Sequence, residues 1–221
     1  MWFLQPGITF EDVLMRILAV LIIVFLIFPL HEYAHAFIAY KLGDRTAKAT
    51  GRLTLNPLAH FDPIGAVLIL FFSFGWAKPV PVDSSNFKNP RRDMLFVSIA
   101  GPISNILAAI LGGFIINFMG VFGSGYVLWL IQIFLAYYVS INVTLAVFNM
   151  LPIAPLDGFG IIEAFLPQKA LIWYYQNQRI ISMVMIFVLF LGFLSRPVAF
   201  LHGTVYNFIM KITSLPFSSI T

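Results

Sequence analysis

Cysteine is absent from this chain, and charged residues are scarce. With 0 cysteines in 221 residues, neither a disulfide framework nor a thiolate metal site can form. Charged residues make up 10% of the chain and hydrophobic residues 60%, whereas an average soluble domain has roughly 25% charged residues. This balance excludes an ordinary soluble domain, a disordered tail and a nucleic-acid binder with a basic face. The mean hydropathy of +0.93 indicates an integral membrane protein.

Long apolar runs predict an all-α polytopic membrane bundle of about five to six transmembrane helices, since a hydrocarbon core of about 30 Å takes about 20 helical residues per crossing. We expect a single membrane-embedded domain over residues 1–221, with its core at about 13–166 and C-terminal helices at about 170–213. The runs that predict crossings are Val13–Tyr40, Met94–Gly120, Tyr126–Leu151, approximately Ile180–Leu194, and Pro197–Ile212, which also contains the polar residues His202 and Asn207.

The segment at about 45–83 differs from these runs, and we expect a small membrane-associated β/re-entrant insertion there. Thr46–Leu55 and Ala77–Val82 carry Thr, Val or Pro and fit short strands. Between them, Pro63–Trp76 is apolar but short for a crossing and contains two glycines, which favours a re-entrant piece. The basic clusters Lys41–Arg52 and Lys88–Arg92 then share one face, which the positive-inside rule identifies as cytoplasmic.

Residues 31–35 read His-Glu-Tyr-Ala-His, a pattern that predicts a metal site. On a helix, positions i and i+4 share a face about 6 Å apart, so the imidazoles of His31 and His35 can bind one metal ion. Glu32 can then reach a water on the metal and act as general base, as in zinc metalloproteases. The alternative is a pair of interfacial histidines, but ionisable groups inside an apolar helix are costly and usually functional.

A catalytic zinc ion needs three protein ligands, and Asp157 is the best candidate for the third. The metzincin spacing requires Gly and His at positions that Ile38 and Lys41 occupy, which excludes it. His60 and Asp62 have an allowed spacing, but they lie in a polar turn, where we expect a solvated role.

The surroundings of Asp157 favour it. It follows a long apolar run and comes after Pro152 and Pro155, which break the helix and free the chain to turn a carboxylate inward. Gly158 permits a close backbone approach. The two motifs also come near the cytoplasmic ends of two crossings that run in the same direction. A purely structural Asp157, capping a helix that starts near Phe159, is the alternative.

Two motifs together resemble the site-2 protease family of intramembrane zinc metalloproteases. They are His31-Glu-Tyr-Ala-His35 and Asn149-x-x-Pro152-x-x-x-Leu156-Asp157-Gly158. Between them, Gly101-Pro-Ile-Ser-Asn105 is similar to the small-residue motif in the family's middle core helix. The length leaves no room for the PDZ or CBS domain of larger members, so the resemblance implies a minimal, core-only member.

The resemblance also implies a role for each site residue. His31, His35 and Asp157 would bind one Zn²⁺ ion, Glu32 would activate water, and Asn149 would assist by stabilising the oxyanion or holding the substrate. The expected function is zinc-dependent cleavage of transmembrane protein or peptide substrates in the lipid bilayer. We expect a prokaryotic cell membrane, with the active site toward the cytoplasmic leaflet.

A predicted strand edge in the insertion would bind an extended substrate by β-addition. The rival interpretation of the whole chain is a catalytically silent metal-binding membrane protein or a metal transporter. A transporter, however, needs ionisable residues along the full membrane depth, whereas here they gather in one leaflet.

Overall fold

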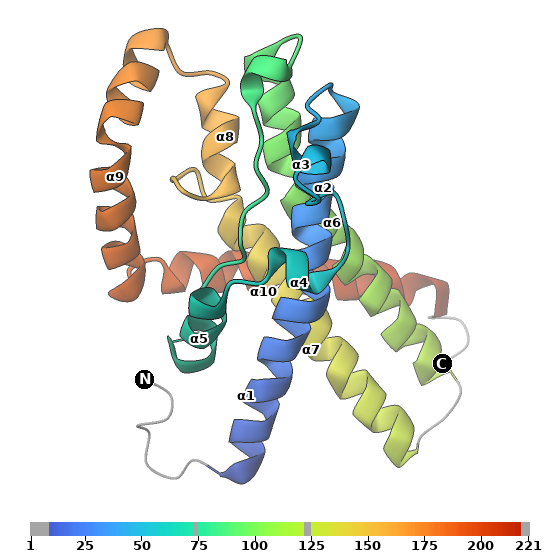
Figure 1. Ribbon diagram of the computed structural model, residues 1–221. Coiled ribbons are helices and arrows are strands. Elements are labelled where there is room, and N and C mark those ends of the chain that lie inside the picture. The colour runs from blue at the N-terminus through green and yellow to red at the C-terminus, as the bar shows by residue number, and fades with distance from the viewer. Residues whose placement is uncertain (1–8, 73–74, 122–124, 218–221) are drawn as a thin grey trace. The chain divides into compact units, whose positions relative to one another are not determined.

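The computed structural model describes residues 9–72, 75–121 and 125–217 (Figure 1). The chain forms two compact units, Met1–Lys88 and Asn89–Thr221. Every regular element in the described ranges is a helix, so the predicted all-α class is confirmed. Three of these helices are long and apolar enough to cross a membrane: Val13–Lys41, Pro90–Gly120 and Tyr126–Asn149. They match the first three crossings predicted from the sequence.

One nearly continuous helix dominates the first unit. It consists of α1 (Phe10–Ile22), a π-helical turn η2 (Ile23–Ile27) and α2 (Phe28–Lys41). Pro29 explains the change of winding, because a proline inside a helix has no N–H and its ring clashes with the carbonyl four residues before it. A π-turn absorbs that clash, and such turns are frequent at functional sites.

The prediction of a strand at Thr46–Leu55 is wrong. Thr46–Ala49 forms a helical turn, α3, because the side chain of Asp44 accepts hydrogen bonds from the N–H and the hydroxyl of Thr46. Gly51, at φ +70°, then ends the turn, and Arg52 N–H donates to the carbonyl of Ala47 at 2.7 Å. The remaining short elements of this unit are α4 (Pro57–His60), α5 (Pro63–Phe72) and η3 (Ser84–Asn86).

The segment that contains α5 folds back on itself. Lys78 N–H donates to the carbonyl of His60 at 2.9 Å, so the residues before and after α5 are adjacent. Gly65 is needed at this turn, since a Cβ there would lie 2.0 Å from the carbonyl oxygen of Trp76. Arg16 Nη2 donates to the carbonyl of Ile69 at 2.8 Å, near the C-terminal end of α5.

A fully buried carboxylate, that of Asp44, joins the end of α2 to η3. Its Oδ1 accepts from Asn86 Nδ2 at 2.8 Å and from Thr46, and its Oδ2 accepts from Asp83 N–H at 2.9 Å. Burial alone would raise the pKa of Asp44, but these hydrogen bonds to the charged form lower it below its ordinary value. The network therefore holds residues 83–86 against the loop after α2.

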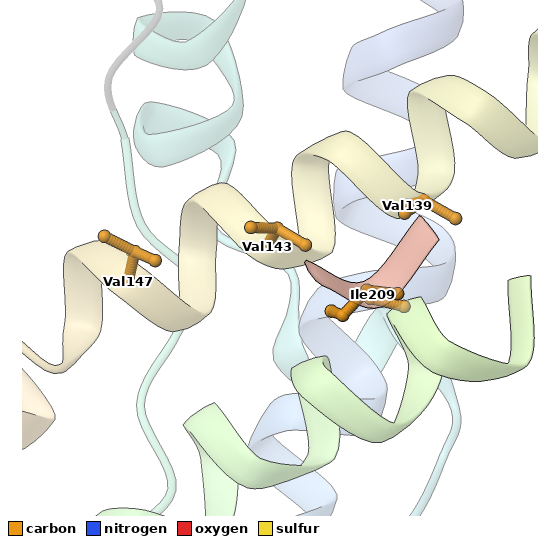
Figure 2. Close-up of a cluster of buried hydrophobic side chains, with 5 residues drawn as sticks. Val139, Val143, Val147 and Ile209 are labelled. Carbon is orange, nitrogen blue, oxygen red and sulfur yellow. The ribbon is translucent and has the colours of Figure 1, made fainter. Parts of the chain in front are cut away.

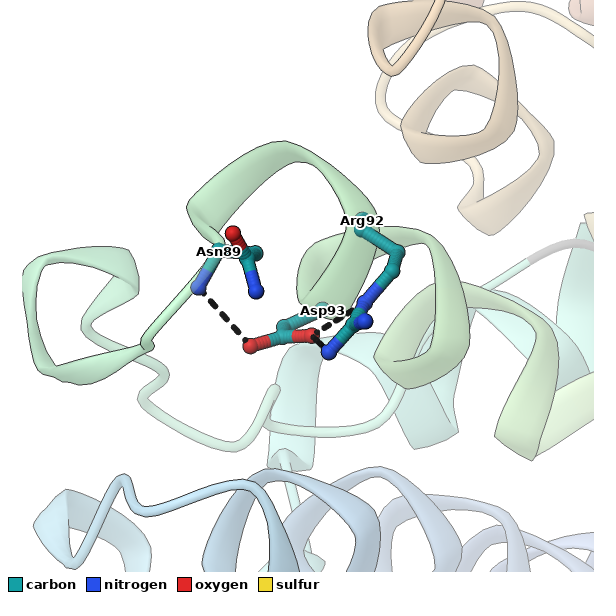
Figure 3. A network of polar contacts seen from close by, with 3 residues as sticks. All are labelled: Asn89, Arg92 and Asp93. Carbon is teal, nitrogen blue, oxygen red and sulfur yellow. Dashed lines mark hydrogen bonds and ion pairs between the residues drawn. The ribbon is translucent and has the colours of Figure 1, made fainter.

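The second unit begins with α6 (Pro90–Gly120), whose first turn is capped by a buried carboxylate (Figure 3). Asp93 Oδ2 accepts from Asn89 N–H at 3.1 Å, which satisfies one of the donors left open at a helix N-terminus. Its Oδ1 accepts from Arg92 at 3.0 Å. This capping places a well-defined helix start directly after the insertion.

The apolar core of this unit lies between α6, α7 (Tyr126–Asn149) and α10 (Ser195–Ser214). Three valines of α7 at i, i+4 and i+8 pack with Ala109 of α6 and Ile209 of α10; they are Val139, Val143 and Val147 (Figure 2). Gly112 and Gly113 let the helices approach closely, because a Cβ would lie 2.8 Å from Val139 and 3.0 Å from Thr213, respectively. A hydrogen bond of 2.9 Å between the buried amides of Asn105 and Asn142 adds a polar link between α6 and α7.

The two C-terminal crossings predicted from the sequence are helices, but they are not among the three apolar spans. Ile180–Leu194 corresponds to the second half of α9 (Gln168–Phe190) and the turn after it. Pro197–Ile212 lies within α10, which also carries Arg196, His202 and Lys211. In the described ranges, the span count is therefore three by length and composition, below the predicted five to six.

The junction from α7 to α8 (Asp157–Glu163) depends on two glycines. A Cβ on Gly158 would lie 2.4 Å from the carbonyl oxygen of Leu151 and 2.5 Å from that of Met150, so the backbone itself excludes any side chain. A Cβ on Gly160 would lie 1.9 Å from Ser98 Oγ of α6. The position of Asp157 thus follows from close backbone packing inside the second unit.

We predict that Gly158→Ala lowers the free energy of unfolding by roughly 1–3 kcal/mol, because the backbone carbonyls cannot give way to the new methyl group. Gly203→Ala is the matched control: Gly203 lies in α10 with nothing within 4 Å of its Cβ position. That change should stabilise the helix by up to about 1 kcal/mol. Thermal or denaturant unfolding in detergent measures both, and equal effects would contradict the close-packing argument.

We predict that Asp44→Asn destabilises the protein at pH 7, because an amide group would face the N–H of Asp83. The lowered pKa means that Asp44 contributes stability above its ordinary value of 3.8, and this stability is lost as the pH falls through the lower folded-state pKa. The difference between wild type and variant should therefore shrink when unfolding is measured at pH 3 instead of pH 7. A difference that does not change with pH would show that the charge of Asp44 is not what stabilises the network.

Candidate metal centre

His31 and His35 lie one turn apart on α2, and both are buried, with 7% and 8% of their surface exposed. Their Nε2 atoms are 3.0 Å apart, and their rings meet edge-on with centroids 4.7 Å apart. Two nitrogens that each lie about 2.0–2.1 Å from one tetrahedral zinc ion are about 3.3 Å apart. The histidine pair therefore has the donor chemistry and the spacing that zinc requires.

Glu32 follows His31 in the sequence, and its side chain is half-buried. A backbone N–H holds its carboxylate. Its Oε2 accepts from Val80 N–H at 2.9 Å. Sequence reasoning missed Val80, because a bond between residues 48 positions apart leaves no periodic signal. The two prolines beside Val80 are the available clue, since they leave its N–H as the single donor between positions 79 and 81.

Ala77–Val82 does not form the strand predicted there, and this correction follows from the same prolines. The backbone groups of this segment bind elements of the first unit instead of a neighbouring strand. Arg52 Nη2 donates to the carbonyls of Lys78 and Pro79, at 2.5 and 3.3 Å. We call residues 77–83 the strap.

His60 and Asp62 have structural roles. His60 is 1% exposed rather than solvated, and its Nε2 lies 2.8 Å from the carbonyl oxygen of Thr54. Asp62 Oδ1 accepts from Gly65 N–H at 2.9 Å at the start of α5. The expectation of a solvated turn is therefore wrong for His60.

Asn149 and Asp157 stand at the α7–α8 junction of the second unit. Asn149 is the last residue of α7, two residues before the predicted end at Leu151, and its half-buried side chain makes no hydrogen bond in the described ranges. Asp157 is also half-buried and is itself the first residue of α8, while Leu156 occupies the capping position. The alternative interpretation, in which Asp157 caps a helix that starts near Phe159, places the helix start two residues too late. The two histidines and Glu32 thus belong to the first unit, and Asn149 and Asp157 belong to the second.

Comparison with known proteins identifies the family. Residues 123–192, which include Asn149 and Asp157, match the model of peptidase family M50. The chain is 44% identical over 171 residues to the Bacillus subtilis protein named "Putative zinc metalloprotease YwhC", covering 75% of this chain and 78% of that relative. No solved structure matches the chain.

Two mycobacterial relatives, each named "Putative zinc metalloprotease Rip2", are 33% identical to this chain. The match to the protein of Mycobacterium tuberculosis spans 174 residues, 74% of this chain and 62% of the relative. The match to that of Mycolicibacterium smegmatis spans 147 residues, 62% of this chain and 53% of the relative. The chain therefore spans only part of the Rip2 proteins but more than three quarters of the Bacillus relative. With this coverage and a zinc-compatible histidine pair on an apolar helix, the chain belongs to peptidase family M50 and is a zinc metalloprotease of the site-2 type.

Proposed function

We propose that this protein is an intramembrane endopeptidase that cleaves transmembrane segments of membrane-protein substrates. The observation that carries the proposal is the position of His31, Glu32 and His35 inside Val13–Lys41, a 29-residue helix that is long and apolar enough to cross a bilayer. A hydrolytic site on such a helix lies within the hydrocarbon region or at its edge, where transmembrane segments are the available substrates.

The proposed zinc ligands are His31, His35 and Asp157. Two imidazoles and one carboxylate leave a fourth position open, which is the ligand pattern of a catalytic rather than a structural zinc site. The tightly packed α7–α8 junction supports the assignment of Asp157, because the backbone at Gly158 lies against the carbonyls of Met150 and Leu151 and leaves no room for a side chain. Zinc, when bound, polarises the scissile carbonyl and lowers the pKa of water toward 7.

The chain's own residues supply the proton transfers and the positioning. Glu32 takes a proton from the attacking water at a carboxylate oxygen and passes it to the leaving amine. Its bond to Val80 N–H uses Oε2 and leaves Oε1 for the proton. Asn149, whose amide is uncommitted in the described ranges, donates to the developing oxyanion or holds the substrate backbone.

We also propose a topology in which α5 is re-entrant. The hydrogen bond that joins Lys78 to His60 brings the two ends of this segment together, as expected if it enters and leaves on one face. The basic clusters Lys41–Arg52 and Lys88–Arg92 then lie on the same side, which is cytoplasmic by the positive-inside rule. This topology puts the active site toward the cytoplasmic leaflet, in the prokaryotic cell membrane that we propose for this protein.

We predict that His31→Ala and His35→Ala lose both zinc and peptide cleavage, whereas Glu32→Gln keeps zinc and loses cleavage by roughly 10²–10⁴-fold, the usual size of a general-base contribution. Zinc is measured by metal analysis of the purified protein, and cleavage is measured on a transmembrane peptide in detergent or liposomes. His202→Ala is the control, because His202 lies in α10 beside Ser140, and it should keep both properties.

Two outcomes would overturn the site. Stoichiometric zinc in the His31→Ala, Asp157→Ala double variant would disprove the ligand set. Zinc-loaded wild-type protein that cleaves no transmembrane peptide, but cleaves a soluble one, would place the reaction outside the membrane.

We predict that cysteines introduced singly at Lys48 and Asn89 react with a membrane-impermeant thiol reagent from the cytoplasmic side. A cysteine at Gly123, which lies outside the residues that the structure describes, should react from the other side. The chain has no native cysteine, so each variant carries one thiol. If Lys48 and Asn89 are labelled from opposite sides, the α5 segment crosses the membrane and the re-entrant topology is wrong.

A further inference from the structure

One peptide unit in the strap connects a buried arginine to Glu32. The unit joins Pro79 to Val80: its carbonyl oxygen lies 3.3 Å from Arg52 Nη2, and its N–H donates to Glu32 Oε2 at 2.9 Å. The same Arg52 nitrogen donates to the carbonyl of the preceding residue, Lys78, at 2.5 Å. A cation on the carbonyl side of a peptide polarises its N–H and strengthens the hydrogen bond to a carboxylate.

The sequence of the strap selects this peptide unit. Pro79 and Pro81 have no N–H, so Val80 has the single backbone donor of residues 79–81. On either side, Lys78 N–H is held by the carbonyl of His60 at 2.9 Å, and Asp83 N–H is held by Asp44 at 2.9 Å. Both ends of the strap are thus fixed within the first unit, and Val80 lies between them at Glu32.

Arg52 is an unusual residue to find in this place. It is 9% exposed, its guanidinium bonds to backbone carbonyls, and its Nε has no hydrogen-bond partner in the described ranges. Burial of a cation is expensive unless its charge is compensated. Anchoring the strap would not require a charged side chain, because a neutral side-chain donor can also bind a backbone carbonyl. The negative group at the other end of the bonded peptide is the carboxylate of Glu32.

We propose that Arg52 is a positioning residue for Glu32. Through the Pro79–Val80 peptide it holds the carboxylate in one orientation, with Oε2 bonded and Oε1 directed to accept the proton of the attacking water. The inference rests on the proposed role of Glu32 as general base, and it assigns to Arg52 and the strap a function beyond that role. Arg52 touches neither zinc nor substrate in this scheme.

The test combines two changes that break the connection at different points. Arg52→Met removes the cation and keeps its apolar length, and Val80→Pro removes the N–H. Each should lower kcat by roughly 10–100-fold, the usual effect of losing a supporting hydrogen bond, with KM changed less than about twofold and zinc content at the wild-type level. Because both act through one peptide, the double variant should be no slower than the slower single variant.

Matched controls separate positioning from general damage. Arg45→Met removes an exposed arginine from the same loop, and Val82→Pro removes an N–H that makes no hydrogen bond in the described ranges. Both should keep wild-type kcat. Arg52→Lys retains a buried cationic donor and should recover part of the activity lost in Arg52→Met.

A second readout needs neither zinc nor turnover. Hydrogen exchange of the Val80 amide, followed by NMR on protein labelled with ¹⁵N-valine, should be about tenfold faster in Arg52→Met than in wild type. Exchange at Val82 should not change. Val80 exchange at the wild-type rate in Arg52→Met would overturn the connection through the peptide, including where a variant is too unstable for kinetic measurements.

The kinetic outcomes distinguish this inference from the proposed function. Retained cleavage in Glu32→Gln would disprove the role of Glu32 itself. Loss in Glu32→Gln with wild-type kcat in Arg52→Met and Val80→Pro would leave that role intact and overturn the positioning. A multiplicative loss in the double variant would also overturn it, and faster cleavage in Val80→Pro would show that the strap blocks Glu32 instead of orienting it.

Discussion

A polar or charged group inside an apolar helix must find a partner within the protein, and this constraint organises the first unit. The side chains of the metal-site motif, those of His31, Glu32 and His35, lie in the apolar span Val13–Lys41. The histidines are within 3.0 Å of each other and have the donor set for zinc, and Glu32 is bonded to the backbone of the strap. Leaving such groups unsatisfied would cost several kcal/mol each. The insertion after α2 therefore supplies polar partners that a single helix cannot provide.

In the second unit, close helix packing positions one carboxylate, that of Asp157, at the start of α8. Glycines do this by close approach: Gly112 and Gly113 bring α6 against α7 and α10, and Gly158 and Gly160 bring α8 against the end of α7 and against α6. Dispersion between tightly packed backbones replaces the hydrophobic drive that helices lack in lipid. The start of α8 at Asp157 follows from this packing.

Residues with strong local chemistry were predictable from the sequence, and residues defined by long-range bonds were not. Length and hydropathy were enough for the first three spans, and the His-Glu-Tyr-Ala-His spacing was enough to expect the imidazole pair on one helix face. The strand at Thr46–Leu55 was wrong because the carboxylate of Asp44 and the positive φ of Gly51 favour a helical turn over the β-propensity of Thr. Arg52 and Val80 could not be found by any periodicity, since their partners are 26 to 48 positions away.

The absence of a strand in the described part of the insertion also changes how a substrate can be bound there. An edge strand would offer a row of alternating donors and acceptors to an unwound helix. The strap has prolines at 79 and 81 and uses the N–H groups of Lys78, Val80 and Asp83 for internal bonds, so Val82 alone can donate between 78 and 83. One donor cannot replace the helical hydrogen bonds that a substrate gives up around the cut. The strap is therefore suited to orienting Glu32 rather than to binding substrate, and the backbone partners of an unwound substrate must come from other parts of the protein.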